Sequence, residues 1–350
     1  MSTEYQLRIY SRAGTLTAVV VDFLRLAYRH QRNAPGILEF EISPTHPAVA
    51  LLELDGLVEC WRRTADLDWY VEFAGFYRWQ QQGLDENGRA WLLVRCPGLL
   101  HLVGRALVAY RRGLPGLSAF VAQPAETIIK ALVSYNCTAL GSIGGGRLRD
   151  VTLDTIQLEA DAGRGNALDF ECSLQNVLAS CQQVAAIGGG DFVMSVVAAA
   201  TYEFAWRAAS TSAVVFAPNM GNMTQPVLTR NWIDTRTVAI AGGPANTYAV
   251  VEGAEYVAAY QDAEMYVYGA GYTTTAGLEA AAETALEGQK ATELEFAIIQ
   301  APQALYGVDY EFLDWVTVRF SDVELTMQIQ EVGVTVDNSG QETIEVVCRE

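Results

Sequence analysis

The stretch that decides the fold, residues 69–108, reads WYVEFAGFYRWQQQGLDENGRAWLLVRCPGLLHLVGRALV. Apolar and other side chains alternate along residues 69–74, and a period of two predicts a strand. Residues 91–96 predict a second strand. The polar link between them ends in Asn87-Gly88, a pair that accepts positive φ and favours a hairpin turn. After this hairpin follows an apolar segment, residues 99–108. The stretch predicts a structural module and contains no catalytic pattern.

Short strands surround this module on its N-terminal side. Residues 28–36 predict a polar turn that contains His30. A short helix is predicted through Leu54, with Thr45 as its N-cap and Gly56 as its stop. Alternating or β-branched residues predict strands at residues 4–10, 16–26, 37–42 and 57–61. Several short strands at such close spacing favour a barrel or a sandwich.

The middle of the chain changes to helical patterns. Residues 111–122 contain two glycines and a proline, and they predict a linker. Pro124 is predicted to start a helix whose apolar face carries residues 128, 129, 132 and 133. Ser173 is predicted to cap a second helix that ends at Gly188. A strand is expected at residues 191–197.

The last third is predicted to return to strands. Residues 217–247 predict a loop-rich region around a strand at 237–240, and residues 275–292 predict a helix. Residues 325, 327 and 329 share one face of a predicted strand, whereas residues 332, 334 and 336 have the opposite parity. The change near Glu331 predicts a bulge or bend. The remaining predicted features are a strand at 315–320, a turn at 337–340 and a closing strand at 343–348.

Composition excludes several classes of protein. The chain has 350 residues, of which 51% are hydrophobic, so it can bury a large core. Its formal net charge of -18 disfavours nucleic acid as a bound ligand, because phosphate contacts need clustered Lys and Arg. No secretory signal is recognised, and the longest early apolar run is too short to span a bilayer. A soluble protein made in the cytoplasm is expected.

No metal or nucleotide site is predicted. None of the six cysteines forms a C-x-x-C pair, and their scatter predicts buried free thiols. His30, His46 and His101 are not four residues from one another or from a cysteine, which disfavours zinc, and His101 is expected to pack or to form hydrogen bonds. The glycine runs 144–146 and 188–190 lack the context of phosphate-binding loops. Catalytic, cofactor-binding and metal-binding residues are all expected to be absent.

Two features keep other functions open. Asp309, Glu311 and Asp314 form a local acidic cluster that could include a glycosidase pair, although a charged loop before a strand is the simpler interpretation. Aromatic residues are numerous, with seven tryptophans and a tyrosine-rich stretch from Tyr256 to Tyr272. Exposed rings would favour a carbohydrate surface, whereas rings on alternating strands favour a core or a subunit interface.

Three stretches, in this order, carry a resemblance. The first contains Asn33-Ala-Pro-Gly36, residues 38–40 and the segment 46–56. The second contains FAGFYR at 73–78 and GLLHLVGR at 98–105. The third runs from Tyr306 through residue 318 and on to the hairpin at 329–348. Together they resemble the siphophage tail-hub, or baseplate-hub, proteins of the tail tip. That family usually has Gly-Asp before the strand of this third stretch, where this chain has Leu313-Asp314 and so keeps the Asp but not the Gly.

The resemblance implies an α+β fold, mainly β, with two β-barrel-like tail-hub domains and helical and loop-rich insertions. The expected division is an N-terminal β-barrel domain at 1–112, a helix-containing middle domain at 113–200, and a loop-rich insertion, long helix and C-terminal β domain at 201–350. The implied function is a structural, non-enzymatic component of the phage tail tip. A homotrimeric hub ring would join the tail tube to the tip or fibre proteins and surround the DNA exit channel used in genome ejection.

The implied partners are other copies of the chain and the adjacent tail-tube, distal-tail and tip or fibre proteins, with no membrane-spanning segment. DNA would pass through the channel without specific binding, and the protein would be found in the virion after assembly in the host cytoplasm. Three copies at -18 each would bring about -54, and an acidic wall repels DNA over roughly one Debye length. The alternatives are a tail-tip adhesin for host-surface carbohydrate, reading it through residues 248–272, and a tail-borne cell-wall hydrolase.

Overall fold

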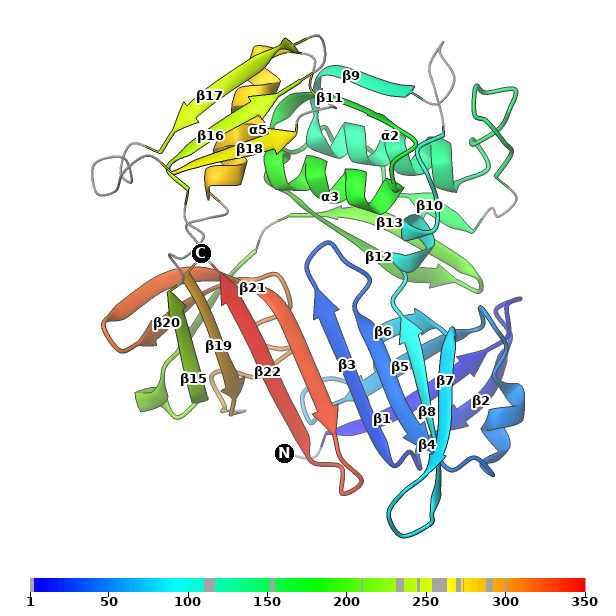
Figure 1. Ribbon diagram of the computed structural model, residues 1–350. Helices are drawn as coiled ribbons and strands as arrows, with labels where there is room; N and C mark the ends of the chain where they lie inside the picture. The colour runs from blue at the N-terminus through cyan, green and yellow to red at the C-terminus, as the bar shows by residue number, and fades with distance from the viewer. Residues whose placement is uncertain are drawn as a thin grey trace.

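The computed structural model describes most of the chain (Figure 1). The described residues are 3–109, 117–151, 155–208, 210–230, 236–243, 246–253, 263–268, 272, 274–287, 292–299 and 301–349. The fold class is α+β and mainly β, as predicted from the sequence. The strand pairs within the described residues form open sheets and close no barrel.

The N-terminal β unit consists of two sheets that face each other. Alternating buried residues on β1 and β4 explain why these segments form strands with one face in the core. The smaller sheet has the order β2 (Leu16–Val20), β1 (Glu4–Tyr10), β5 (Leu57–Arg63) and β6 (Tyr70–Phe76). The larger sheet includes β3 (Arg25–Gln31), β4 (Ile37–Ile42), β8 (Ala90–Pro97) and β7 (Trp79–Leu84).

The C-terminal β unit continues this larger sheet. Strand β21 pairs antiparallel with β3, with Val334 opposite Tyr28, so the first and last parts of the chain lie side by side (Figure 1). The sheet therefore has ten strands. The added ones are β15 (Met223–Arg230), β19 (Thr292–Ile298), β22 (Glu342–Arg349), β21 (Val323–Val336), β20 (Trp315–Phe320) and β14 (Thr211–Phe216). One hydrophobic core spans both units.

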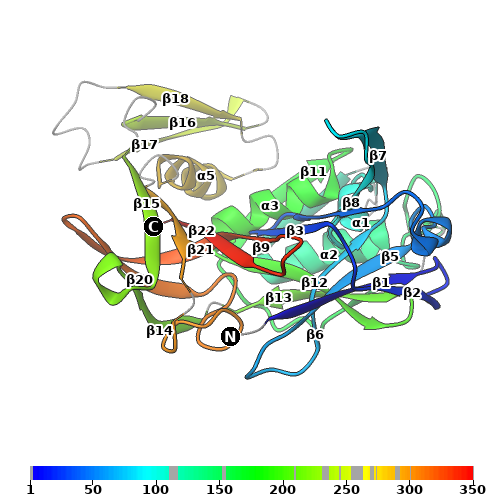
Figure 2. The ribbon, with the colours of Figure 1, turned by 90° about the horizontal axis from the view of Figure 1, so that it is seen from below.

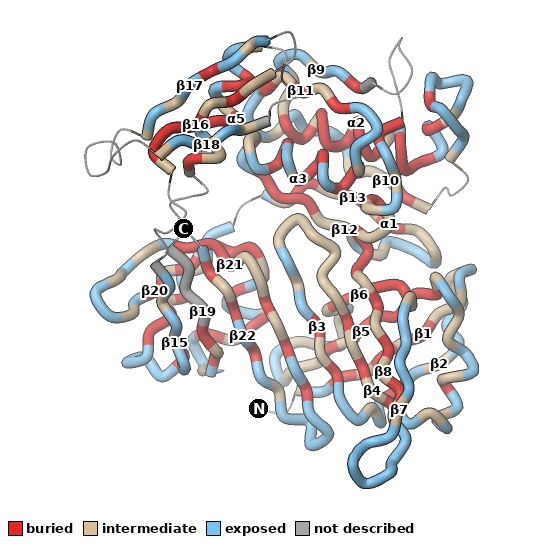
Figure 3. The backbone as a smooth tube through the Cα atoms, viewed as in Figure 1, coloured by how far each residue is buried: buried red, intermediate tan, exposed pale blue. Residues whose placement is uncertain are grey.

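A helical layer lies above these sheets and has its own core. Helices α2 (Ala125–Cys137) and α3 (Val177–Gly188) pack together, with α1 (His101–Gly104) beside them. The strands of this layer form two sheets, β9 (Leu117–Pro124) with β11 (Ala167–Ser173), and β10 (Ile156–Leu158), β13 (Thr201–Arg207) and β12 (Asp191–Ala198) in that order. Figure 3 shows buried residues concentrated along α2 and α3.

A small sheet with one helix forms the remaining part. Strand β16 (Val238–Gly242) lies between β17 (Tyr248–Glu252) and β18 (Glu264–Tyr268). Helix α5 (Thr275–Glu287) covers one face of this sheet (Figure 2). Leu278, Ala282 and Leu286 recur at helical spacing and are buried on that helix.

Several predictions for the first hundred residues were wrong. The expected polar turn at 28–36 contains most of β3, in which Tyr28 is buried, and the expected strand at 16–26 is divided between β2 and β3. The hairpin turn at Asn87-Gly88 is confirmed by positive φ at Gly88, but β8 pairs with β7. Strand β7 is exposed and rich in glutamine, so its sequence resembles a polar link and it was not predicted as a strand. The predicted cap at Thr45 is replaced by His46, whose Nδ1 accepts from Ala48 N ahead of the 3-10 helix η1 (Pro47–Leu51).

Later boundaries also differ from the predictions. The linker expected at 111–122 becomes β9 from residue 117, and residues 111–116 lie outside the described part. The cap expected at Ser173 is Asn176, whose side chain accepts a hydrogen bond from Ala179 N. The loop-rich region contains strand β15, and the helix predicted to reach 292 ends at Glu287 before β19 begins.

The predictions for the bulge in β21, for the turn before β22 and for the cysteines are confirmed. The register of β21 against β22 shifts between Ile329 and Glu331, which confirms the predicted bulge. Gly340 has a φ of 79° in the predicted turn before β22. All six cysteines are free and buried, as predicted.

Candidate functional site

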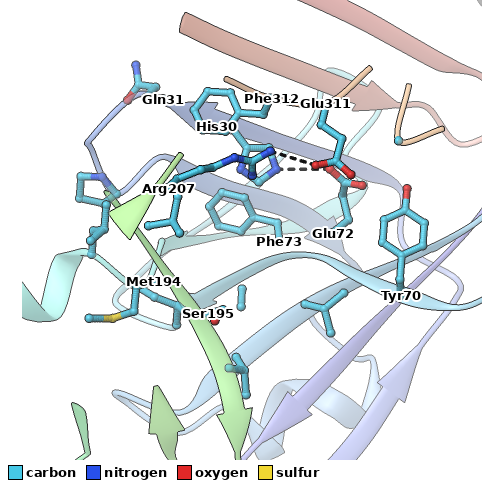
Figure 4. Close-up of a pocket in the computed structure, with 18 of the residues that line it drawn as sticks. His30, Gln31, Tyr70, Glu72, Phe73, Met194, Ser195, Arg207, Glu311 and Phe312 are labelled. Atoms are coloured by element: carbon cyan, nitrogen blue, oxygen red, sulfur yellow. Dashed lines mark hydrogen bonds and ion pairs between the residues drawn. The ribbon is translucent and has the colours of Figure 1, made fainter. Parts of the chain in front are cut away.

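A cavity of about 640 Å³ lies where the N-terminal β unit, the segment 306–312 and strand β12 meet (Figure 4). Titratable side chains from separate parts of the chain line it. The side chains that the close-up labels are His30, Gln31, Tyr70, Glu72, Phe73, Met194, Ser195, Arg207, Glu311 and Phe312. No pattern in the sequence indicated that His30, Glu72 and Phe73 would come together.

His30 and Glu72 form the polar centre of this cavity. His30 projects from β3 and its Nε2 lies 3.3 Å from Oε1 of Glu72 on β6. The imidazole lies between two phenylalanine rings, with centroid distances of 5.1 Å to Phe73 and 5.3 Å to Phe312. The Phe312 ring is stacked on it with an interplanar angle of 27°. These contacts hold the imidazole in one orientation toward the carboxylate.

Glu72 is a buried carboxylate that is stabilised in its charged form. Its side chain is 6% exposed, and burial by itself would raise its pKa. The hydrogen bond and charge of His30, the positive charge of Arg62 and the hydroxyl of Tyr306 outweigh burial and lower the pKa. Tyr306 donates to Glu72 Oε1 at 2.8 Å. Glu72 therefore retains a negative charge beside the cavity at neutral pH.

Arg62 extends this polar network into the core. Its side chain is 2% exposed and pairs with Glu342 on β22. Arg62 also donates to the hydroxyl of Tyr5 at 3.0 Å, to the hydroxyl of Tyr70 at 2.8 Å and to the carbonyl of Tyr306 at 3.1 Å. The guanidinium thus connects β1, β5, β6 and β22 with the 306–312 segment, and it satisfies a buried charge with several acceptors.

A second polar junction lies on the other side of the β3–β4 turn. Arg32 donates to Asp191 Oδ1, and Gln328 on β21 donates to Asp191 Oδ2 at 2.9 Å. Asn33 accepts from Phe192 N at 2.8 Å, and its carbonyl accepts from Gln182 on α3 at 2.8 Å. Asp191 is buried, so these bonds position β12 against both β units.

The side chains that line the cavity suit recognition by charge and shape. Among the described residues, no hydrogen bond joins His30 to a serine, threonine or cysteine side chain, which nucleophilic catalysis would use. The described part of the chain contains no group of three His, Cys, Asp or Glu side chains arranged to hold a metal ion. A paired imidazole and carboxylate beside aromatic walls can bind a polar or cationic group.

The acidic cluster that suggested a glycosidase pair has local partners. Asp314 accepts from the Ser210 hydroxyl and from Glu311 N, and Asp309 accepts from Leu305 N at 2.8 Å. Glu311 pairs with Arg207 at 2.9 Å. These contacts fit the simpler interpretation, in which the charged loop is braced ahead of β20.

The other two histidines have separate surroundings. His46 caps η1 and its Nε2 lies 3.1 Å from Asp22 Oδ1. His101 begins α1, and burial followed by the nearby positive charges of Arg78 and Arg105 lowers its pKa. Neither lines the cavity. The spacing of the three histidines along the sequence gave no reason to choose His30.

The aromatic side chains divide into two sets. Arginine guanidinium groups lie over three of the tryptophan rings: Arg8 over Trp61 at 3.5 Å, Arg95 over Trp79 at 4.4 Å and Arg63 over Trp69 at 4.9 Å. By contrast, Tyr248 and Tyr266 on the small sheet are 69% and 65% exposed. Trp232 and much of the stretch 256–272 lie outside the described residues.

The signals for the cavity were weak in the sequence. Glu72 stood out only as a carboxylate on a predicted strand, and His30 fell in a segment predicted to be a turn. Arg62 was one residue past the end of the predicted strand 57–61. A charged residue beside an alternating strand indicates that a partner of opposite charge is buried with it. For Arg62 that partner is Glu342 on β22, 280 residues further along the chain, so the sequence alone does not identify it.

Comparison with known proteins identifies the family. The family described as Siphovirus ReqiPepy6 Gp37-like protein matches residues 6–348, which is nearly the whole chain. The chain belongs to this siphovirus tail protein family, and the resemblance inferred from its sequence is confirmed. No curated protein matches the chain significantly.

Solved structures share the fold at low sequence identity. The tail protein from Neisseria meningitidis MC58 aligns over 100% of this chain and 97% of its own, with 10% identity and a TM-score of 0.63. The 43 kDa tail protein of prophage MuSo2 from Shewanella oneidensis aligns over 99% and 96%, with 12% identity and a TM-score of 0.63. The prophage tail protein gp18 from Listeria monocytogenes EGD-e aligns over 99% and 94%, with 10% identity and a TM-score of 0.55. The fold is that of phage tail proteins, and no helix in the described residues is long and apolar enough for a membrane span.

Proposed function

We propose that this chain is a non-enzymatic hub subunit of a siphophage tail tip. Three copies would form a ring that joins the tail tube to the tip or fibre proteins and surrounds the path of the DNA. The observation that carries the proposal is the family match over residues 6–348, combined with a fold shared end to end with phage tail proteins. The proposed location is the tail tip of the virion, after assembly in the host cytoplasm.

The arrangement of the β units supports a ring. The N-terminal and C-terminal units lie side by side in one sheet through the pairing of β3 with β21. Three copies would therefore present six β units around an axis, and closed rotational symmetry is the usual outcome when each copy makes the same contact with the next. The divisions at residues 112 and 200 are part of this proposal, with the middle domain as an attached layer.

Strand β2 is a suitable subunit contact. It is an edge of the four-stranded sheet, and edge strands expose backbone groups that can pair with another chain. Val19 is 48% exposed and Val21, just past the strand end, is 66% exposed, while Leu24 is also exposed. An edge with exposed apolar side chains is unusual unless something covers it.

The test is the mass of the purified protein in solution, measured by light scattering over a concentration series at near-physiological salt. The monomer mass is 38.1 kDa, and a species of three times that mass is the expected result. The double variant Val19→Lys/Val21→Lys should shift the protein to monomer, because edge lysines oppose strand pairing. Thr335→Lys, at an exposed position on β21, is the matched control. A monomer at every concentration would argue against a self-assembling ring.

A second candidate is an adhesin for host-surface carbohydrate. The observation that favours it is the exposure of Tyr248 and Tyr266, which lie on the face of the small sheet opposite α5. Binding of purified host cell-wall polysaccharide would test it. Adhesin function predicts that Tyr248→Ala/Tyr266→Ala abolishes binding and that Val19→Lys/Val21→Lys does not. Under the hub proposal, the unaltered protein does not bind the polysaccharide.

A further inference from the structure

Two strand edges face the same cavity. Residues 67–68 and 70–74, which include most of β6, line one side, and residues 192–196 of β12 line the other. In the close-up, Met194 and Ser195 lie on one side of the cavity and Tyr70 and Glu72 on the other (Figure 4). The two strands belong to different sheets, so this cavity is a slot between two sheet edges.

Both edges are open within the described residues. Strand β6 is the last strand of the sheet β2-β1-β5-β6, and β12 is the last strand of the sheet β10-β13-β12. Beyond their ladder partners β5 and β13, the described part of the chain gives the backbone of residues 71–74 and 193–196 no backbone hydrogen-bond partner. Open strand edges are templates for an added strand.

The slot is held open by packing at one end. Phe76 meets Tyr202 edge-on with a centroid distance of 5.3 Å, and a small apolar cluster joins these rings to Leu57 and Leu99. At the opposite end the lining reaches Leu67 and Asp68. The sheets are therefore fixed together next to the slot, and its two edges are set in place before any occupant arrives. Such preorganisation lowers the entropic cost of binding.

The side chains that line the slot are suited to bind a basic side chain next to an apolar one. Three carboxylates line the slot, those of Asp68, Glu72 and Glu311, against the single guanidinium of Arg207 and the imidazole of His30. Arg207 is already paired with Glu311. The remaining lining is largely apolar or aromatic, with Phe73, Phe312, Leu99, Leu100, Met194 and Val196. Aromatic faces beside carboxylates favour a cation.

We propose that this slot binds an extended segment of another protein by strand addition to β6, with a Lys or Arg side chain of that segment directed toward Glu72. Its backbone supplies the hydrogen bonds that the β6 edge leaves open, and alternate side chains fill the apolar part of the slot. The net charge of -18 makes a second copy of this chain a poorer source of such a segment than a basic partner protein. The inference concerns this slot alone and does not depend on whether the chain forms a hub ring.

The test uses three labelled heptapeptides and the full chain, with fluorescence anisotropy as the measurement. The probe is Thr-Val-Thr-Arg-Thr-Val-Thr, blocked at both ends. The second peptide has Glu in place of Arg, and the third has N-methyl groups on alternate residues, which remove backbone donors. We expect saturable binding of the first peptide and about tenfold weaker binding of each of the others, because both a charge-assisted contact and the backbone ladder are lost.

Protein variants then locate the binding. Ser195→Trp fills the slot from an exposed position on β12 and should abolish binding, while Thr335→Trp makes the same change on an exposed strand outside the slot and should leave it intact. Glu72→Gln should remove the preference for Arg over Glu and leave the effect of N-methylation unchanged. Circular dichroism confirms that each variant is folded.

Two outcomes would overturn the proposal. The first is that none of the peptides binds the unaltered protein; if Ser195→Trp then also lowers the mass seen by light scattering, a second copy occupies the slot. The second is that binding persists in Ser195→Trp, which would place it elsewhere on the surface. A ring that forms normally without peptide binding would contradict this inference and leave the hub proposal standing.

Discussion

Arg62 and Glu342 are 280 residues apart in the sequence and form a buried ion pair, with Nε 3.0 Å from Oε2. Arg62 lies on β5 and Glu342 begins β22, so the pair connects the small N-terminal sheet to an interior strand of the large sheet. The Tyr5 hydroxyl donates to the same Glu342 carboxylate. The two sheets that enclose the main core are therefore joined by charge as well as by apolar packing.

Removing one partner of this pair should destabilise the fold strongly. We expect Arg62→Met to lower the free energy of unfolding by about 3–5 kcal/mol, because it leaves the Glu342 carboxylate buried without its cation. Urea unfolding followed by tryptophan fluorescence measures the change. Arg62→Met/Glu342→Met should recover much of the loss, since no charge is left unpaired. Equal losses for the single and double variants would contradict the assignment.

Asn33 offers a way to separate backbone strain from side-chain hydrogen bonds. Its φ is 52°, and its side chain bonds to Phe192 N, to the carbonyl of Gly190 and to the Asp191 carboxylate. Asn33→Gly keeps a backbone that accepts this conformation and loses these bonds, whereas Asn33→Ala also adds strain. We expect Asn33→Ala to be less stable than Asn33→Gly by about 1–2 kcal/mol. Thermal and urea unfolding of the two variants measure this difference, and equal stabilities would show that strain is absent at this position.

Glu126 should make stability depend on acid pH. Hydrogen bonds from the Arg164 side chain outweigh burial and, together with those from Lys130, hold the pKa of this carboxyl well below its usual 4.5. Because the folded pKa is depressed, the stabilisation is present above about pH 4.5 and is lost as the pH falls toward the folded pKa. Glu126→Gln should cost about 2 kcal/mol at pH 7 and less below pH 4. Unfolding free energies of both proteins across this range measure the effect, and a pH-independent difference would contradict it.

The six cysteines should react only after unfolding. Burial raises the pKa of Cys137, Cys172 and Cys348 to about 12, and it also raises those of the other three. The thiolate is the reactive form, so a folded chain at pH 8 should show almost no reaction with Ellman's reagent. In denaturant all six should react. Fast labelling of one or more thiols in the native protein would mean that its burial is broken by local opening.

Helices and strands with a strong local periodicity were predicted correctly, whereas strands with polar or exposed residues were missed. Helices α2 and α3 and strands β4, β20 and β22 were found because their periodicity is local and strong. The bulge at Ile329–Glu331 was predicted because a change of parity is visible without any partner strand. Strand β7 was missed because it is an exposed edge rich in glutamine, and β3 because it carries His30 and two arginines that are typical of a turn or a solvated face.

The cavity could not be predicted in the same way. His30, Glu72, Phe312 and Met194 come from four segments separated by tens to hundreds of residues, and nothing in one sequence states that they meet. The predicted family supplied the fold and the proposed role, but not this group of residues. Glu72 was noted only as a member of an alternating strand.

The sequence by itself determined the class of fold, the family, helices α2, α3 and α5, about half of the strands, the bulge in β21 and the buried state of the cysteines. All of these depend on short-range pattern, composition or the order of motifs along the chain. The tertiary structure alone decided that β21 pairs with β3, that Arg62 meets Glu342, and that the edges of β6 and β12 face one slot. The physical reason is that strand pairing and burial of charge are settled between segments distant in sequence, where each strand has many partners of similar local quality and the whole core selects one arrangement.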